Sequence, residues 1–337
     1  MRRPQLSKLG HNINKDGELK MIVRLGYVAI SNKLGKKATS SSTVTYSNYQ
    51  KILSDEKKIE KLKTVIASNL NGLEKHIKYN IENNIHFYRI TSALIPLITH
   101  PEVKYFEYRK MFKKDFEYIG NLINEYNMRV DTHPDEFNVI NSVNPAVVES
   151  TKTTLNIHVD WFEEMHYDKG KMVLHVGGAT GGKEAGMERF IHNFSTYPER
   201  IKNKVILEND DKTYTAAETL KLCKALNIPM VLDVHHHNCN NNGENINDIW
   251  AEIVNTWNNQ PLPPKIHFSS PREGKFDRKH ADYINSEEFM KFINSAKELH
   301  RDFDVMLECK EKDIALFKLV DDIKEYYHWI DETTFEV

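Results

Sequence analysis

Side chains that bind metal ions or transfer protons recur along this chain, each at or just after the end of a short apolar run. Histidines fill four or five of these positions, and two glutamates and one aspartate fill others. Six consecutive runs, beginning with the one that ends at His133, carry such a residue type. The full set is Tyr27, Arg89, His133, His175, Glu208, Asp233 with His235 to His237, Lys265 with His267, and Glu308 with Lys310.

The residue types in this set favour a metal site. Imidazole nitrogens and carboxylates without a thiolate suit Zn²⁺, Mn²⁺ or Mg²⁺ and do not suit an iron–sulfur cluster. The set exceeds the three or four protein ligands that one ion needs, so we expect two or three ions. Sites with several ions lower the pKa of a bound water and stabilise the attacking and leaving oxygens at phosphorus. The residues therefore favour phosphodiester hydrolysis.

Each position also has an ordinary structural explanation. A single histidine at a strand end is more often a hydrogen-bonded residue than a ligand, and Asp210 and Asp211 could cap the helix that follows them. If the strand continues past Asp233, His235 lies on the same face as Asp233 and His236 points the other way. Only part of this tract could then bind metal. Coincidence at six successive strand ends is improbable, however, so we favour one shared site.

These residues converge only if the elements that carry them do. Eight apolar runs are predicted strands, at residues 21–30, 85–91, 128–133, 172–178, 204–210, 230–237, 264–270 and 304–310. Eight stretches with helical spacing alternate with them, at residues 56–83, 107–126, 145–167, 186–202, 213–226, 246–258, 286–300 and 312–328. This alternation predicts an α/β fold with a parallel sheet, and eight repeats match a single (β/α)₈ TIM barrel. The C-terminal ends of all strands then meet at one face.

A doubly wound open sheet is the alternative fold. It fits less well, because no strand is followed by a GxGxxG or GxxxxGK turn, and the GGATGG sequence at 177–182 matches neither pattern. Within the barrel, Ser54 and the Asn144–Pro145 pair are predicted helix starts. We expect residues 1–20 to be an extension, 21–330 the barrel with a loop at 31–50, and 331–337 a tail.

Composition and charge narrow the class of protein. The 337 residues are 40% hydrophobic and 28% charged, which is typical of a globular protein, and no apolar run suits a membrane span or a signal peptide. Three widely spaced cysteines indicate reduced thiols, so we expect a cytoplasmic protein, associated with the nucleoid if the source is prokaryotic. Residues 1–132 carry 23 Lys and Arg against 13 Asp and Glu, a net +10, and the remainder carries 23 against 35, a net −12. The basic part could meet a polyanion.

Ordered motifs along the chain resemble the UV damage endonucleases, the ultraviolet dimer endonuclease family. The resemblance covers roughly residues 22–328 and extends more distantly to apurinic endonucleases and xylose isomerase-like barrels. The motifs are RLGY at 24–27, FYRI with LIPLITHP within 87–101, THP at 132–134, LHVGG at 174–178, LEND at 207–210, DVHHH at 233–237, PKIHFSS at 264–270 and MLECKEKD at 306–313.

The resemblance implies a barrel that binds damaged double-stranded DNA and nicks it 5′ to a cyclobutane dimer or a (6–4) photoproduct. It implies two or three divalent ions, with Mn²⁺ preferred over Mg²⁺, Co²⁺ or Zn²⁺, and a lysine at Lys265 that can carry a carboxylated amino group. We expect Lys265, Glu208 and His236 to take part in catalysis. The implied metal ligands are His133, His175, Glu208, Asp233, His236, His267, His280 and Glu308.

The chain departs from the family after the His–Pro of the third strand. Some members have a Gln–Tyr pair that probes damaged bases, whereas this chain has Asp135, Glu136 and Phe137. Asn32 is the residue nearest to a family asparagine after the first strand. We expect DNA or lesion contacts from Tyr27, Arg89, Glu136, Phe137 and Lys310. Four of them have a structural alternative: Tyr27 could cap the core, Arg89 could pair with a ligand carboxylate, Phe137 could be loop packing, and Lys310 could be a solvated side chain.

Other function classes remain open from the sequence. An apurinic-type endonuclease differs in substrate alone, a metal-dependent sugar isomerase would share barrel and ligands, and a noncatalytic protein would bind damaged DNA without nicking it. No GxSxG elbow indicates covalent catalysis. We expect a monomer whose phosphate contacts come from the basic first part, including the Lys33–Lys37 loop and the Lys104–Lys114 region.

Overall fold

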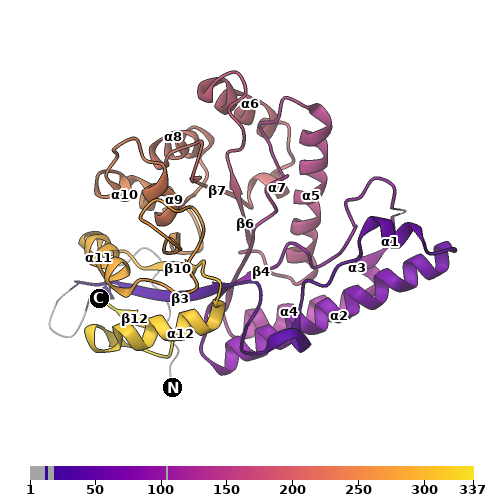
Figure 1. Cartoon of the computed structure of the whole chain (residues 1–337), viewed down its shortest axis with the longest axis horizontal. Helices are drawn as coiled ribbons and strands as arrows, with labels where there is room; N and C mark the ends of the chain where they lie inside the picture. Colours follow the sequence, from indigo (N-terminus) through magenta and orange to yellow (C-terminus); the bar gives the residue numbers. More distant parts are fainter. Residues whose placement is uncertain (1–11, 14–18, 104) are drawn as a thin grey trace.

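Parallel strands and alternating helices build the centre of this protein, as the sequence pattern predicts (Figure 1). The computed structural model describes residues 12–13, 19–103 and 105–337. The expected extension at residues 1–20 lies largely outside the described residues, as does Lys104. Eight parallel strands of the described part form the barrel: β3 (Ile22–Val28), β4 (Phe87–Ile90), β5 (Arg129–Thr132), β6 (Lys171–His175), β7 (Val205–Glu208), β8 (Met230–Asp233), β9 (Lys265–Phe268) and β10 (Phe303–Leu307).

The barrel closes between its first and last parallel strands. β10 pairs with β3 in parallel, with Phe303 opposite Val23 and Leu307 opposite Tyr27. Each of the other strands pairs with its neighbour in sequence order. Closure therefore confirms the predicted (β/α)₈ barrel and excludes the open-sheet alternative.

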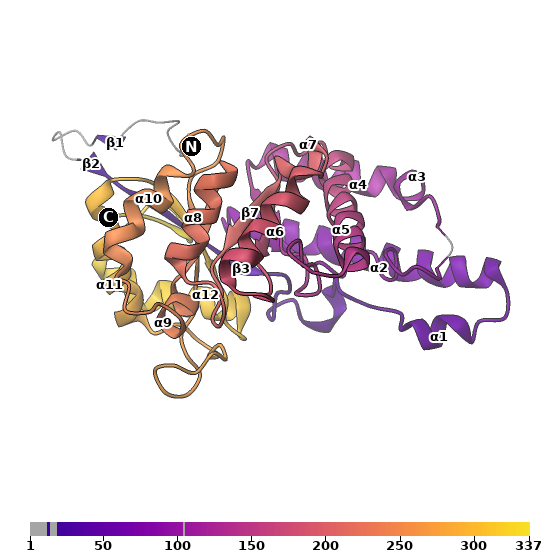
Figure 2. The same cartoon turned by 90° about the horizontal axis from the view of Figure 1, so that it is seen from above.

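Helices cover the outside of the barrel between successive strands (Figures 1 and 2). Among the described residues none of them is both long and apolar enough to cross a membrane. The principal helices are α2 (Asp55–Glu82), α4 (Lys113–Glu125), α5 (Pro145–Glu164), α6 (Lys183–Ser195), α8 (Ala216–Leu226), α10 (Ile246–Asn255), α11 (Ser286–Ala296) and α12 (Lys312–Ile323). Shorter ones are η1 (Gly35–Ala38), α1 (Tyr46–Gln50), α3 (Tyr108–Met111), α7 (Glu199–Lys202), α9 (Val234–Cys239), η2 (Lys297–Leu299) and η3 (Lys324–Tyr326).

Helix starts follow the capping chemistry of the sequence. Ser54 accepts a hydrogen bond from the Lys57 amide, and Asn144 accepts one from the Ala146 amide, as predicted. The helix after β7 begins differently from our expectation, because Thr215 caps it and forms a capping box with Glu218. Asp210 instead accepts backbone amides of the turn that precedes the cap. Neither Asp210 nor Asp211 is the cap that the sequence suggested.

Long helix α2 carries an arm of the molecule away from the barrel. At 1.5 Å per residue its 28 residues span about 42 Å, and its N-terminal part projects together with α1 and α3 (Figure 2). The predicted loop at 31–50 therefore contains two short helices, η1 and α1. The predicted helix at 107–126 is divided at Phe112 into α3 and α4.

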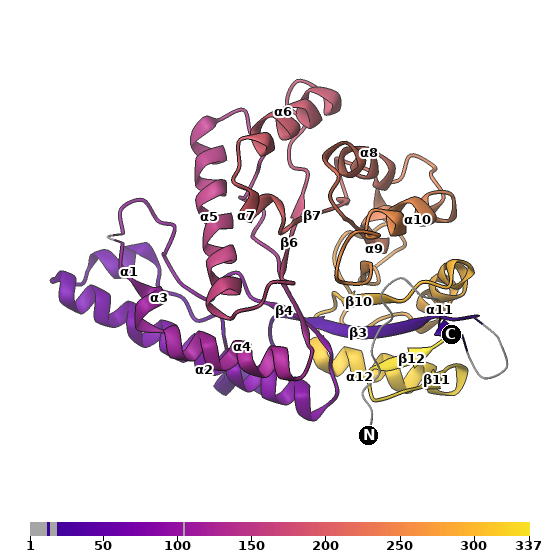
Figure 3. The ribbon, with the colours of Figure 1, turned by 180° about the vertical axis from the view of Figure 1, so that it is seen from behind.

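The C-terminal residues join the sheet instead of forming a separate tail. β12 (Thr334–Glu336) pairs antiparallel with β3 at Ile22, Val23 and Arg24, and β11 (His328–Trp329) pairs with β12 (Figure 3). At the other end, β1 (Asn12–Ile13) pairs with β2 (Leu19–Lys20). We expected the barrel to end at residue 330 and a tail to follow, but the sheet continues past that residue through β12.

Candidate metal centre

Glu208 occupies the middle of a cluster of imidazoles at the C-terminal end of the barrel. It is the last residue of β7, and 1% of its surface is exposed. His133 Nε2 lies 3.1 Å from Glu208 Oε2, and His267 Nδ1 lies 2.8 Å from Oε1. Burial opposes ionisation of this carboxyl, but His267, His175 and His133 outweigh burial and hold its pKa well below the usual range.

Three groups of potential metal ligands share Glu208. Within each group one nitrogen or oxygen atom per residue lies within 4.8 Å of the others. Because all three groups contain Glu208, they form one continuous cluster of potential ligands. The groups are His133, His175 and Glu208; Glu208, Asp233 and His236; and Glu208, His267 and Glu308.

The tract at 233–237 is positioned by a helix, which corrects our expectation of a continued strand. β8 ends at Asp233, and the Asp233 side chain caps α9 by accepting the His236 amide at 2.7 Å. This turn brings His236 Nδ1 within 3.7 Å of Asp233 Oδ2 and 3.5 Å of Glu208 Oε1. His235 instead packs edge-on against His280. The helical turn therefore selects His236 as a ligand candidate and directs His235 elsewhere.

Asp233 and His236 form a coupled acid–base pair. Burial raises the pKa of Asp233 to about 8, although the nearby His236 favours its ionised form. Burial lowers the pKa of His236, but the carboxylates of Asp233, Glu208 and Glu308 outweigh it and raise the value to about 9. Without a cation the pair retains a proton at neutral pH. A cation that binds both side chains must displace it.

Glu308 follows β10 and joins the centre from the opposite side. Its carboxylate is ion-paired with Arg89 and lies 3.1 Å from His267 Nδ1. His280 is more peripheral, because its Nδ1 lies 4.0 Å from Glu308 Oε2 and it belongs to none of the three groups. Seven of the eight implied ligands thus fall into the groups, and His280 stands beside them.

Buried polar atoms of the centre fit a cation better than an apolar core. Asp233 Oδ2, His175 Nδ1 and His267 Nε2 are buried and have no hydrogen-bond partner among the described residues. Asp233 Oδ2 faces His236, whereas in His175 and His267 the other ring nitrogen, Nε2 and Nδ1 respectively, is the one nearest Glu208. An unsatisfied buried polar group costs about 1–3 kcal/mol, and a bound ion is one reason why a protein retains one, so Asp233 Oδ2 is the atom that favours a cation here. The mixed nitrogen and oxygen donors suit divalent transition metals.

Lys265 lies two residues before His267 and deeper in the barrel. Its side chain is fully buried, and Nζ donates to Asp131 Oδ2 at 3.2 Å. Burial lowers the pKa of this amine to about 8, although Asp131 favours the charged form. The structure therefore places the Lys265 nitrogen next to a carboxylate beneath the three ligand groups.

Asp131 belongs to a buried ionic layer that we did not predict. Asp304 accepts hydrogen bonds from Arg24 at 2.7 Å and from Arg129 at 2.8 Å, and Arg129 also contacts Asp131 at 3.2 Å. Barrel interiors usually hold layers of branched apolar side chains, so this charged floor is a departure. The sequence signal was the strand alternation: Asp131 and Lys265 stand two residues before His133 and His267.

Two loops at the C-terminal end of the barrel are joined by one asparagine. Asn141, after His133, donates to the Gly178 carbonyl at 2.7 Å and accepts from the Gly178 amide at 3.1 Å. Gly177 has φ of 106°, and a Cβ atom there would lie 2.4 Å from Asn141 Oδ1. The GGATGG sequence therefore fixes the loop after His175 against the loop after His133.

Comparison with known proteins identifies the family of this chain. Residues 23–336 match the model of the family described as UV-endonuclease UvdE. The chain belongs to this family. It is 38% identical over 312 residues to a protein of Halalkalibacterium halodurans named UV DNA damage endonuclease, covering 91% of this chain and 95% of the relative. A Bacillus cereus protein of the same name is 40% identical over 304 residues, covering 90% and 95%.

Solved structures agree with the UvdE assignment. The crystal structure of SacUVDE superposes with a TM-score of 0.80 at 34% identity, covering 90% of this chain and 98% of that one. Endonuclease IV of Thermus thermophilus superposes with a TM-score of 0.54 at 12% identity, covering 90% and 99%. The second likeness shows the barrel fold alone. The resemblance inferred from the motifs is confirmed.

Candidate DNA-contacting residues of this UvdE chain differ in exposure. Glu136, Phe137 and Lys310 are exposed, and Phe137 keeps 77% of its surface accessible. Tyr27 is fully buried and donates to Asn80 Oδ1. It therefore belongs to the core, the alternative that we gave for it, and has no exposed surface that DNA could contact. Arg89 also takes the alternative that we gave for it, because its guanidinium pairs with the carboxylate of the ligand candidate Glu308.

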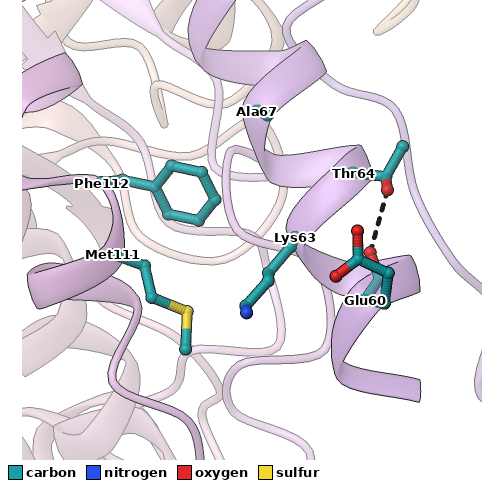
Figure 4. Close-up of a pocket in the computed structure, with 6 residues that line it drawn as sticks. All are labelled: Glu60, Lys63, Thr64, Ala67, Met111 and Phe112. Atoms are coloured by element: carbon teal, nitrogen blue, oxygen red, sulfur yellow. Dashed lines mark hydrogen bonds between the residues drawn. The ribbon is translucent and has the colours of Figure 1, made fainter. Parts of the chain in front are cut away.

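Two hollows near the arm of this UvdE chain lie apart from the metal centre. One cavity of about 470 Å³ is lined by Glu60, Lys63, Thr64, Ala67, Met111 and Phe112, between α2 and α3 (Figure 4). A second, of about 220 Å³, lies between α5 and the loop that carries Asp135 and Phe137. None of the residues of the three ligand groups lines either cavity.

Proposed function

We propose that this chain nicks double-stranded DNA on the 5′ side of ultraviolet photolesions, including cyclobutane dimers and (6–4) photoproducts. The observation that carries the proposal is the position of Glu208 in three overlapping ligand groups, in a chain of the UvdE family. The reaction is hydrolysis of a phosphodiester. Water adds to phosphorus and the bond to the 3′ oxygen breaks, which leaves a 3′ hydroxyl and a 5′ phosphate.

Divalent cations, Mn²⁺ foremost, fit the three ligand groups, with Mg²⁺, Co²⁺ and Zn²⁺ as the alternatives. Such cations supply positive charge that lowers the pKa of water and stabilises the oxygens of a phosphate under attack. The chain's part is to keep Glu208 and Glu308 ionised through their imidazole and guanidinium neighbours. His280 would complete the centre from the loop before α11.

His236 and Lys265 have distinct parts in this proposal. His236 lies beside both Glu208 and Asp233, so it orients the carboxylates at the point where the groups meet. Lys265 supports the centre from below. A carboxylated Lys265 requires a neutral amine, which the lowered pKa of this buried group favours. The carbamate would be an anion, so it would have to turn away from Asp131 toward the ligand groups.

Recognition of DNA would use the exposed residues around the centre. Lys33, Lys36 and Lys37 are exposed on the segment after β3, where they can contact phosphates. Phe137 can stack on or wedge between bases of a duplex that a lesion has already weakened, and the charge of Glu136 tunes that contact. Lys310 lies on the loop after Glu308. We propose that the chain acts as a monomer on DNA.

Incision of defined duplexes tests this proposal. Labelled duplexes carry one cyclobutane dimer, one abasic site or no lesion, and each is incubated with Mn²⁺, with chelator, and with His175→Ala. We expect a metal-dependent nick 5′ to the dimer that His175→Ala loses. Cutting at the abasic site alone would point to an apurinic-type endonuclease. Binding without cutting in every divalent metal would point to a noncatalytic protein, and absence of both would favour the isomerase.

A further inference from the structure

The loop between β9 and α11 folds back on itself as a hairpin. Pro271 and His280 form an antiparallel bridge, and the Arg272 amide donates to the Lys279 carbonyl at 2.8 Å. The hairpin, defined as residues 271–280, is therefore closed at its base. His280, the peripheral ligand candidate, is its last residue.

Internal hydrogen bonds brace the tip of this hairpin. The Asp277 carboxylate accepts the Glu273 amide at 3.1 Å and the Lys279 amide at 3.0 Å, while the Asp277 amide donates to the Gly274 carbonyl at 3.0 Å. Cys239, at the end of α9, donates its thiol to the Phe276 carbonyl at 3.8 Å. The backbone at Phe276 is thus held from two sides, so its side chain is presented in a fixed place.

Phe276 itself has no apolar cover. Its side chain keeps 66% of its surface exposed, and the ammonium of Lys275 lies 5.5 Å from the ring centroid. An exposed aromatic ring on a braced loop can stack on a flat ring of a bound partner. Phe276 and Phe137 are the two exposed phenylalanines on loops of the described part that follow barrel strands.

The hairpin is basic within an acidic part of the chain. It carries Arg272, Lys275, Arg278 and Lys279 against Glu273 and Asp277, a net charge of 4 − 2 = +2, whereas residues 133–337 together carry −12. All four cations are exposed. Arg278 is ion-paired with Asp211, which ties the hairpin to the segment after β7. The Asp277 carboxylate accepts two backbone amides, and Lys275 and Lys279 are exposed.

The hairpin lies next to the metal centre. The rings of His280 and His236 are 6.2 Å apart, and Figures 1 and 2 draw the chain before α11 beside α9. Phe276 precedes His280 by four residues, so their Cα atoms are at most about 14 Å apart. That span equals about four steps of 3.4 Å along a DNA strand. A strand whose scissile phosphate lies at the centre and that runs along the hairpin would therefore pass within reach of Phe276.

We propose that hairpin 271–280 clamps the DNA beside the scissile phosphate, with Phe276 stacked on a flanking nucleobase and Lys275 and Lys279 paired with phosphates. This inference rests on the proposed function and adds a second aromatic contact to the one expected at Phe137. Aromatic stacking tolerates any base sequence, because every base has a π face. Such a contact suits an enzyme that must act wherever a lesion occurs.

Single-turnover incision of a dimer-containing duplex tests the aromatic contact. The rate is measured over a range of enzyme concentration with Mn²⁺, which separates the half-saturating concentration from the maximal rate. Phe276→Ala should raise the half-saturating concentration roughly tenfold to hundredfold, the range of one base–aromatic stack, and leave the maximal rate within about twofold. Phe276→Trp should restore tight binding, since a larger ring also stacks.

The salt dependence of DNA affinity separates the phosphate contacts of Lys275 and Lys279 from the stacking contact of Phe276. Lys275→Ala and Lys279→Ala should each reduce the slope of log affinity against log salt by about one, whereas Phe276→Ala should leave that slope unchanged. Tyr326→Ala is the matched control, because Tyr326 keeps 67% of its surface exposed after α12, at the far end of that helix from the catalytic face. It should match wild type in every measurement.

The outcomes are distinguishable from failure of the proposed function. If wild-type protein nicks the dimer duplex and Phe276→Ala matches it in half-saturating concentration, the hairpin inference is wrong and the proposed function stands. A lowered maximal rate with unchanged half-saturation, not rescued by Phe276→Trp, would equally overturn the stacking contact. If wild-type protein nicks none of the duplexes, the proposed function fails, and the clamp fails with it.

Discussion

Arg89 on β4 is ion-paired with Glu308, the residue that follows β10. Glu308 Oε1 also lies 3.1 Å from His267 Nδ1. Burial opposes ionisation of Glu308, yet Arg89 and His267 hold its pKa below the usual range. The arginine that we had expected on DNA therefore pairs with a candidate metal ligand. It keeps a candidate ligand anionic at acidic pH.

Removing this guanidinium should change metal binding at acidic pH. In Arg89→Met the pKa of Glu308 rises toward its ordinary value, so protons compete with the cation at higher pH than in wild type. We expect the acidic fall in Mn²⁺ affinity to begin at a higher pH, by calorimetric titration between pH 5 and 8. Arg301→Met is the control, because Arg301 precedes β10, at the end of the strand opposite to Glu308, and donates to Asn258. Superimposable pH profiles for Arg89→Met and wild type would contradict this role.

Metal uptake should release a proton at neutral pH. Because the pKa of Asp233 is raised to about 8, the Asp233–His236 pair is protonated below that value, and a cation must displace the proton. Affinity should rise by at least about tenfold per pH unit up to pH 8 and should level off only above about pH 9, where His236 has also lost its proton. Calorimetry in buffers of different ionisation enthalpy measures the protons released. Asp233→Asn should bind less tightly and with a shallower pH slope, and an unchanged slope would show that Asp233 is not the proton carrier.

The buried ionic floor should matter for stability. Asp304 is fully buried and pairs with both Arg24 and Arg129, so Asp304→Asn leaves two buried cations with less compensation. Breaking a buried ion pair costs about 3–5 kcal/mol, and we expect a loss of that size in the free energy of unfolding in urea. Asp321→Asn, on the exposed surface of α12, should cost less than about 0.5 kcal/mol. Equal stability of the two variants would refute a structural role for the floor.

Exposed residues after β5 should govern lesion recognition. Phe137→Ala removes a side chain that is 77% exposed. It should raise the half-saturating enzyme concentration for incision of a dimer duplex about tenfold, the lower end of the range for one stacking contact. Glu136→Gln removes a negative charge beside the DNA backbone and should tighten binding at low salt. The check is incision at two salt concentrations. Equal binding by Glu136→Gln and wild type at low salt would place this loop away from the DNA.

The strands and most ligand candidates could be predicted because both depend on simple periodicity. Apolar β-branched runs mark the strands, and the barrel topology brings their ends together regardless of separation in sequence. His133, His175, Glu208, His267 and Glu308 follow from that rule alone. The closing pair between β3 and β10 likewise follows from the count of repeats.

The remainder depends on local geometry that the sequence pattern does not show. The strand before His236 ends at Asp233, four residues before the predicted end at 237, because the Asp233 side chain caps a helix there. That turn exchanges the faces of His235 and His236. Tyr27 and Arg89 stand at strand ends like the ligands, but burial against Asn80 and pairing with Glu308 decide their orientation. The orientations of Tyr27 and Arg89 thus depend on contacts with residues distant in sequence, which the spacing of the motifs does not show.

Mapping of the cut and its end groups tests the central claim most directly. A duplex with a single cyclobutane dimer is incubated with wild-type protein and with Glu208→Gln in Mn²⁺, and the products are resolved at single-nucleotide resolution. We predict one nick immediately 5′ to the dimer, with a 3′ hydroxyl that a polymerase extends and a 5′ phosphate, and a loss of at least about a hundredfold in Glu208→Gln. Full activity of Glu208→Gln, or ends formed by elimination at the sugar, would contradict metal-assisted hydrolysis at this centre.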